Sequence, residues 1–277
     1  NLWLARYKKE VYNKKNHEFE SHSNMELDYV KESRGIILEK ETNKIVCYPP
    51  DGAVSYQDIW EDDVSNMSFI LAIEGTQVTL YNYEGRWCVS TKGAINASNS
   101  RWMSSRSFMD MFLDAAAEAN LDYSRLNENY CYTFILCHPE NKIINTITSP
   151  LLYHIHTRDL STLEEVDITL ENEKIYKPKQ YNNVKSKEDF GSIMDMFVDY
   201  PGLGVVIKNS KGEIHRVEGE LYSRLREIKS NNRNIYFRML ELHCAGRFDD
   251  VNLFLQFFPE YLQGVQDMTG VRIPKLI

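Results

Sequence analysis

The amino-acid sequence of 277 residues lacks several features that would assign it to a specialised class of proteins. It contains no run of roughly 18 uncharged apolar residues, so we expect no segment that crosses a membrane. Its five cysteines are scattered, and none are spaced as Cys-x-x-Cys. This odd number and spacing argue against a disulfide framework or a zinc site, and they favour a reducing, cytoplasmic location.

An excess of basic residues is absent as well. The 32 lysines and arginines are outnumbered by 40 aspartates and glutamates, which gives a net charge of −8. No global positive field therefore attracts nucleic acid, and any such binding depends on a local basic patch. What is present is the composition of a soluble globular protein with a sizeable core, with 43% hydrophobic and 26% charged residues.

The spacing of apolar residues predicts a mixed α+β body followed by a helical tail. Alternating residues and turn sequences predict strands or hairpins at 35–46, 68–95, 131–137, 142–147, 151–156 and 203–217. Helical spacing predicts helices at 104–120 and 187–196, and several more over 219–262. For residues 1–31 we expect a helix followed by the start of a strand.

Short segments, taken in order, match the motifs of a known enzyme family. They are Arg-Gly-Ile at 34–36, Ala-Ile-Glu-Gly-Thr at 72–76, Thr-Lys-Gly at 91–93, Phe-Ile-Leu-Cys-His-Pro-Glu-Asn-Lys-Ile at 134–143, Leu-Gly-Val-Val at 203–206 and Arg-Val-Glu-Gly-Glu-Leu-Tyr at 216–222. Together with the strands between them, they resemble the RNA ligases of T-even bacteriophages and the adenylyltransferase domain of fungal tRNA ligases. The resemblance implies an RNA ligase-like nucleotidyltransferase domain of mixed sheets with helices over 1–225, and a small helical C-terminal domain over 226–277.

The sequence departs from the family pattern at four positions on which the reaction depends. Family members attack the α-phosphate of ATP with a lysine at the position of Ala72, which has no nucleophile. Glutamates that help to hold metal are replaced by Ile135 and Leu203, which cannot bind a hard cation. One of two paired lysines that neutralise phosphate charge is replaced by Glu218. The resemblance therefore implies a protein without catalytic residues, metal ligands or a cofactor.

Other matched positions keep side chains that suit a nucleotide or its phosphates. By the resemblance, the expected ligand-binding residues are Arg34, Glu74, Lys92, Arg158, Arg216 and Glu218. His154 and His156 alternate along an expected strand, which predicts that both side chains lie on one face. The sequence offers no third ligand to accompany them, so we expect histidines held within the core or cleft instead of a metal site.

The expected function is binding of an RNA 5′ end or an mRNA cap nucleotide in the former ATP cleft. Aromatic faces and the carboxylates of Glu74 and Glu218 suit the positively charged base of a 7-methylguanine cap. The aromatic residues in or near the matched segments are Tyr48, Tyr56, Trp60, Tyr81, Tyr83, Trp87 and Trp102.

Three other interpretations remain open at the level of sequence. In the first, the chain is a scaffold or regulatory subunit, and a protein partner docks on its Phe- and Leu-rich C-terminal helices. In the second, it is an active ATP-dependent RNA ligase in which Ala72 replaces a lysine, although this does not account for the other three departures. In the third, the motif register differs and Lys92 or Lys208 is the nucleophile.

Overall fold

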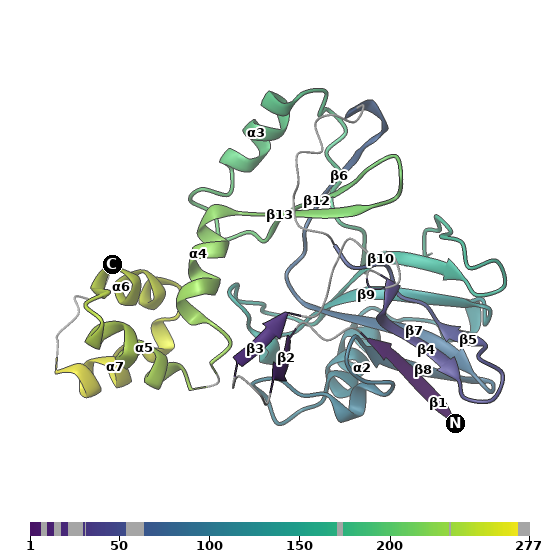
Figure 1. Ribbon diagram of the computed structural model, residues 1–277, viewed down its shortest axis with the longest axis horizontal. Coiled ribbons are helices and arrows are strands. Elements are labelled where there is room, and N and C mark those ends of the chain that lie inside the picture. Colours follow the sequence, from purple (N-terminus) through teal and green to yellow (C-terminus); the bar gives the residue numbers. More distant parts are fainter. Residues whose placement is uncertain are drawn as a thin grey trace.

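The computed structural model describes residues 1–6, 10–13, 18–21, 30, 32–53, 64–170, 174–232 and 234–270, with only the backbone described at 10–13 and 18–21. Two sheets, each with a helix on one face, make up the body of the described chain, and helices near the C-terminus gather at one side (Figure 1). This is the mixed α+β architecture that the sequence predicted.

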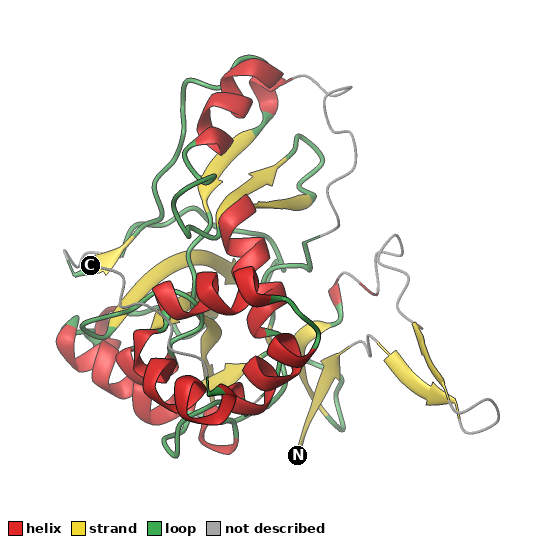
Figure 2. Cartoon of the chain, turned by 90° about the vertical axis from the view of Figure 1, so that its left-hand side faces the viewer, coloured by secondary structure: helices red, strands yellow, loops and turns green. Residues whose placement is uncertain are grey.

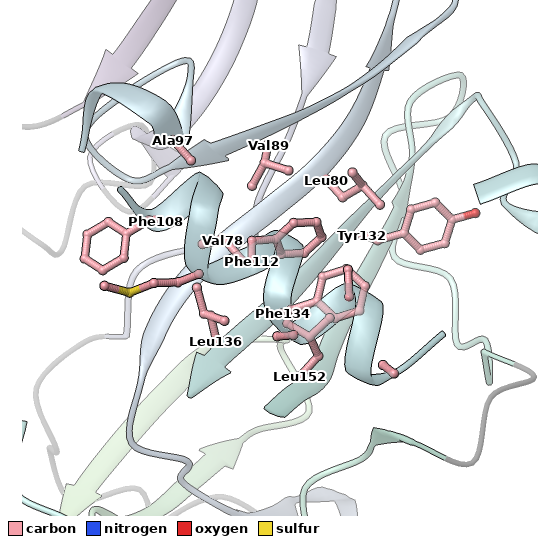
Figure 3. Packing of buried hydrophobic residues seen from close by; sticks show 14 of the residues in the cluster. Val78, Leu80, Val89, Ala97, Phe108, Phe112, Tyr132, Phe134, Leu136 and Leu152 are labelled. Carbon is pink, nitrogen blue, oxygen red and sulfur yellow. The ribbon is translucent and has the colours of Figure 1, made fainter. Parts of the chain in front are cut away.

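The larger body sheet has five strands in the order β11-β10-β9-β7-β8. They are β7 (Thr76–Tyr83), β8 (Arg86–Thr91), β9 (Tyr130–Cys137), β10 (Leu151–Asp159) and β11 (Ile175–Tyr176). Helix α2 (Phe108–Glu118) starts at a Ser107–Asp110 capping box and covers one face. The ring centroids of Phe112 in α2 and Phe134 in β9 lie 6.2 Å apart within the main apolar cluster (Figure 3).

The second body sheet has the order β13-β12-β6. Its strands are β6 (Ser68–Leu71), β12 (Gly204–Lys208) and β13 (Ile214–Glu218). Helix α3 (Lys187–Asp195) packs on one face, where Phe190 lies 5.7 Å from Phe69 between ring centroids and shares a cluster with Val205 and Ile207. Because side chains alternate along a strand, Lys208 and its neighbours two residues apart lie on the opposite face.

Two smaller sheets come from the first 50 residues. One has the order β1-β4-β5, formed by β1 (Leu2–Arg6), β4 (Arg34–Glu39) and β5 (Ile45–Cys47). The other pairs β2 (Glu10–Asn13) with β3 (Glu18–Ser21), a hairpin that extends away from the body in Figure 2. The expected helix in 1–31 is wrong at residues 2–6, since Leu2 and Leu4 pack on a buried cluster while β1 pairs with β4.

Helices α4 (Glu220–Lys229), α5 (Ile235–Cys244), α6 (Phe248–Phe257) and α7 (Leu262–Thr269) share one apolar core. The rings of Phe254 and Phe258 stack at its centre, 4.3 Å apart. The domain boundary predicted between residues 225 and 226 falls inside α4, and the division into two domains stays a prediction. No helix in the described part of the chain is long and apolar enough to span a bilayer.

One predicted strand is wrong. Residues 142–147 form no strand, although the neighbouring predictions at 131–137 and 151–156 are confirmed by β9 and β10. The backbone of this segment bonds to side chains instead of a sheet neighbour. The N–H groups of Ile144 and Asn145 donate to Glu74, and the carbonyls of Lys142 and Ile143 accept from Lys229.

Candidate functional site

Three of the four positions that depart from the family pattern, namely 72, 203 and 218, lie close together at one end of the three-stranded sheet. Ala72 follows β6, is buried, and its N–H donates to the carbonyl of Gly204 over 2.9 Å. Gly204 in turn pairs with Glu218 and follows Leu203. Its φ is +117°, and a Cβ there would lie 2.1 Å from the carbonyl oxygen of Val217, so only glycine fits. The matched segments at 72–76, 203–206 and 216–222 therefore converge in space.

Ile135, the fourth position that departs from the family pattern, contacts this region at Gly75. A Cβ on Gly75 would lie 2.6 Å from Cγ2 of Ile135 and 2.6 Å from the carbonyl oxygen of Leu136. Ile135 is the register partner of Gln77 on β7 and of Tyr153 on β10. The matched segments at 134–143 and 72–76 are thus packed against each other.

Glu74 lies at the junction of these segments, and its carboxylate is held inside the protein. Oε1 accepts from the N–H groups of Ile144 and Asn145 over 3.0 and 2.9 Å, and Oε2 accepts from the Asn145 amide over 3.1 Å. The hydroxyl of Tyr222 in α4 is also hydrogen-bonded to it. Burial raises the pKa of Glu74, and these donors oppose that rise. Glu74 therefore connects the matched segment at 72–76 to helix α4.

Glu218 has its charge compensated by two arginines. Its Oε1 lies 2.8 Å from Arg216 and 2.8 Å from Arg226, and its Oε2 accepts from Ser223 over 3.0 Å. The Glu218 side chain is 14% exposed, whereas those of Arg216 and Arg226 are 40% and 54% exposed. The group carries a net charge of +1, so the negative charge expected to repel a phosphate is neutralised locally.

The two sheet faces left uncovered by α2 and α3 are bridged by an ionic chain. Lys208, on the uncovered face of the three-stranded sheet, forms an ion pair with Glu165. Glu165 Oε1 lies 3.5 Å from Nδ1 of His156 on β10. The hydrogen bond to His156 and the ion pair with Lys208 lower the pKa of Glu165 to about 2. The faces opposite α2 and α3 are thus joined by side chains, although the five-stranded one is covered around Tyr81 and Cys131 by Ile37 and Cys47.

His154 and His156 lie on opposite faces of β10, so the prediction of a shared face is wrong. A β-bulge at Ile155 pairs His154 with Phe134 but His156 with Thr133, adjacent residues that point to opposite sides of β9. His154 therefore packs against Phe134 on the α2 side, with ring centroids 5.5 Å apart. Within the described residues, no three Cys, His, Asp or Glu side chains are arranged to hold a metal ion.

Arg34 and Lys92 are brought together by a glycine. Gly35 has a φ of +105°, and a Cβ there would lie 3.2 Å from Cα of Lys92. The Arg34 guanidinium donates to the carbonyl of Asp51 over 3.3 Å, and Lys92 is exposed in the turn after β8. The matched segments at 34–36 and 91–93 therefore adjoin at this point.

Arg158 lies on the uncovered face of the five-stranded sheet with its guanidinium over the Tyr48 ring, 4.0 Å from the centroid. It donates to the carbonyl of Leu163 over 2.7 Å. In the part of the chain that the structure describes, Nε of Arg158 and Nε2 of His156 are buried without a hydrogen-bond partner. Such buried polar atoms are uncommon, and they point to a polar ligand or water between the sheets.

Several residues that shape this region were missed from the sequence. Tyr153 lies beside Ile135 on the neighbouring strand. Asn145 and Tyr222 are hydrogen-bonded to Glu74, and Arg226 forms an ion pair with Glu218. Only Tyr222 could have been found from the sequence, because it is the last residue of the matched segment at 216–222. Of the aromatic residues noted earlier, Tyr56 and Trp60 lie outside the described residues.

Known proteins similar to this chain include two viral ones. The immediate-early protein ICP-46 homolog of Invertebrate iridescent virus 3 is 25% identical over 252 residues, which cover 84% of this chain and 55% of that protein. The putative bifunctional polynucleotide kinase/RNA ligase of Autographa californica nuclear polyhedrosis virus is 23% identical over 264 residues, covering 88% and 37%. The chain thus spans about half the length of the first relative and little more than a third of the second. No family model matches.

Solved structures with a similar backbone arrangement include an RNA ligase of Naegleria gruberi. A mutant of that enzyme with ATP and Mn has a TM-score of 0.42 at 11% identity, covering 58% of this chain and 52% of that one. Another mutant with AMP and Mn has a TM-score of 0.43 at 11% identity, covering 60% and 53%. The resemblance to RNA ligases that the motifs indicated is confirmed by the sequence of the putative bifunctional polynucleotide kinase/RNA ligase, which is similar to 88% of this chain.

Proposed function

We propose that this chain binds the 5′ end of an RNA between the two uncovered sheet faces and does not catalyse ligation. The observation that carries the proposal is the convergence of Ala72, Ile135, Leu203 and Glu218 at one place, through the contacts of Gly75 and Gly204. The structure therefore supports the motif register in which these residues occupy the positions of the nucleophile, the two glutamates and a lysine.

The chemistry at that place lacks two separate requirements of nucleotidyl transfer. Ala72 offers no amine to attack an α-phosphate. Ile135 and Leu203 offer no oxygen ligands for a hard cation. Lys208, the rival nucleophile, has its ammonium paired with Glu165 and lies four residues beyond Gly204.

Positive charge remains for a phosphorylated 5′ end. The Arg216–Glu218–Arg226 group keeps a net charge of +1 with both guanidinium groups partly exposed. Arg158 presents a buried, unbonded Nε on the facing sheet. Because Glu74 and Glu218 already accept hydrogen bonds within the protein, neither is free to pair with a methylated cap base. The proposal therefore favours 5′ phosphates, and a cap is one arm of the test.

The binding test compares RNAs of one sequence that end in a 5′ triphosphate, monophosphate, hydroxyl or 7-methylguanosine cap. Phosphorylated ends should bind more tightly than the hydroxyl end, and EDTA should leave their affinity unchanged because the chain offers no metal ligands at 135 and 203. Equal binding of all four RNAs would overturn the proposal. Preference for the capped RNA would restore the cap hypothesis.

The catalytic test uses radiolabelled ATP or GTP with magnesium. We expect no amine-linked nucleotide adduct on the protein, nor on an Ala72→Lys variant, because the other three departures remain. Adduct formation by the variant would show that the metal-binding and phosphate-binding functions are intact, and would favour an active RNA ligase.

A second proposal concerns the C-terminal helices. Phe237, Phe248 and Met268 are 53%, 54% and 43% exposed on α5, α6 and α7. We propose that residues 226–277 form a domain that presents these side chains to a protein partner. A photo-crosslinking group at Phe237 should capture a discrete partner in cell extract, while the same group at Trp3, 55% exposed on β1, should not. Equal capture at both positions would contradict it.

A further inference from the structure

Residues 174–181, called the rim segment below, connect the edges of the two body sheets. At its start, β11 pairs in parallel with β10, which places Tyr176 beside Tyr153. At its end, the N–H of Leu71 donates to the carbonyl of Lys179 and the N–H of Tyr181 donates to the carbonyl of Phe69, each over 2.8 Å. The rim segment therefore borders the space between the two uncovered faces on one side.

An aromatic row leads from the candidate site to the rim segment. Tyr153 is the register partner of Ile135, and Tyr176 is the register partner of Tyr153, so the three side chains share the uncovered face. The rings of Tyr153 and Tyr176 lie 5.5 Å apart at 37°. Tyr176 is 43% exposed, which leaves one ring available at the sheet edge. An exposed aromatic face of this kind can stack on a base of any identity.

The rim segment is also the beginning of a lysine-rich stretch that contains no acidic residue. Residues 174–187 contain five lysines and no aspartate or glutamate, in a chain whose net charge is −8. Lys177 lies 3.5 Å from Asp167, a side chain that is 99% exposed, and Lys174 lies 3.6 Å from Glu118, which is 59% exposed. Exposed ion pairs of this kind contribute little free energy, so phosphates can replace the carboxylates.

Lys179 completes the pattern by lying over the Tyr181 ring, 5.1 Å from its centroid. Lysines and tyrosines thus lie close together along one short segment, in the order Lys174, Tyr176, Lys177, Lys179 and Tyr181. An acidic peptide would use the lysines but has no bases for the exposed ring. Lysines interspersed with tyrosines fit a single-stranded nucleic acid, which offers phosphates to the cations and bases to the rings.

We propose that the rim segment is a binding track for single-stranded RNA, which stacks a base on Tyr176 and places phosphates on Lys177 and Lys179. The inference rests on the proposed function, because the track holds the nucleotides that follow a 5′ end seated between the sheets. It explains how a chain of negative net charge holds RNA, since the contact is confined to one acid-free segment.

Fluorescence anisotropy tests the track with a 3′-labelled single-stranded RNA of about 12 nucleotides, a length suited to one binding site of this kind. The RNA is used with a 5′ triphosphate and with a 5′ hydroxyl, and a DNA of the same sequence is added as a third arm. Tyr176→Ala should weaken binding of both RNAs by roughly fivefold or more. Lys177→Glu with Lys179→Glu should weaken it further and reduce the dependence of affinity on salt.

Two matched controls separate the track from general effects. Tyr236→Ala removes a tyrosine of similar exposure, 39%, from α5. Lys40→Glu with Lys211→Glu makes the same charge change in exposed turns. Both controls should bind RNA as the unmodified protein does.

The outcomes for the track and for the 5′ end are distinguishable. Loss of affinity in both rim variants but not in the controls supports the track, whichever 5′ end is used. If the rim variants bind as tightly as the controls, or the unmodified protein binds neither RNA, the track is overturned. A preference for the triphosphate that survives in the rim variants would keep the proposed function without the track. Tighter binding of DNA than of RNA would overturn the RNA assignment.

Discussion

The Glu74 carboxylate accepts hydrogen bonds from the backbone N–H groups of Ile144 and Asn145 over 3.0 and 2.9 Å. Through this contact the matched segment at 72–76 fixes the loop that follows the matched segment at 134–143. Tyr222 brings α4 to the same carboxylate, and Asn145 donates in turn to the carbonyl of Pro201 over 2.9 Å. A residue that the family resemblance assigned to ligand binding is therefore a structural acceptor for two parts of the chain, the loop at 144–145 and helix α4.

We expect Glu74→Ala to lower the free energy of unfolding by about 1–3 kcal/mol, because it leaves buried donors without an acceptor. Glu74→Gln should cost less, since one amide oxygen still accepts a hydrogen bond. Urea unfolding measures both, with Glu128→Ala in an exposed loop as the control. A Glu74→Ala protein as stable as the control variant would show that these hydrogen bonds contribute nothing to stability.

The contact between Gly75 and Ile135 gives a second prediction. Gly75→Ala should destabilise the protein by roughly 1–3 kcal/mol, since its Cβ would overlap Ile135 and the Leu136 carbonyl. Gly191→Ala in α3 is the matched control, because no atom lies within 4 Å of its added Cβ and alanine favours helix. In thermal unfolding, the melting temperature should fall for Gly75→Ala and rise for Gly191→Ala. Equal melting temperatures would place Ile135 away from Gly75.

The sequence predicted the elements whose stability is local and missed those that depend on distant partners. The strand at 131–137 and the helix at 187–196 were predicted correctly because apolar periodicity and capping residues lie within the segments themselves. Residues 142–147 resemble a strand, yet Glu74, about 70 positions away, takes up their backbone donors. No local pattern carries that information.

The candidate site shows the same division. Motif order was enough to bring positions 72, 135, 203 and 218 together, because each lies at a strand that the sequence showed. The faces of His154 and His156 were mispredicted because a bulge at Ile155 adds one residue to the alternation. The partners of Glu218 were not predicted, and one of them, Arg226, reaches it from the next helix, eight residues along the chain.

The chain of Lys208, Glu165 and His156 predicts how stability depends on pH. Glu165 has a folded-state pKa of about 2 against an ordinary value of 4.5. Its contribution is therefore present above pH 4.5 and is lost as the pH falls toward 2. The Glu165 side chain is 43% exposed, so solvent screening reduces the contribution to about 1 kcal/mol.

The free energy of unfolding of the Glu165→Gln variant should accordingly be about 1 kcal/mol lower than that of the unmodified protein at pH 7. This difference should become smaller near pH 3. Urea unfolding at several pH values measures this, and Glu164→Gln, at the adjacent exposed residue, serves as the control. A difference that stays constant with pH would mean that the Glu165 charge is not what joins the two sheets.

The Arg216–Glu218–Arg226 group predicts a gain of binding. Glu218→Gln removes the central negative charge and raises the net charge of the group from +1 to +2. If 5′ phosphates bind beside these arginines, affinity for a 5′-triphosphate RNA should rise by roughly fivefold at low salt, and the gain should fade as salt screens the charge. Glu227→Gln makes the same charge change on the exposed side of α4, where Glu227 pairs with Arg247, and should have little effect. Equal gains in both variants would reflect net charge alone, and no gain in either would place the phosphates elsewhere.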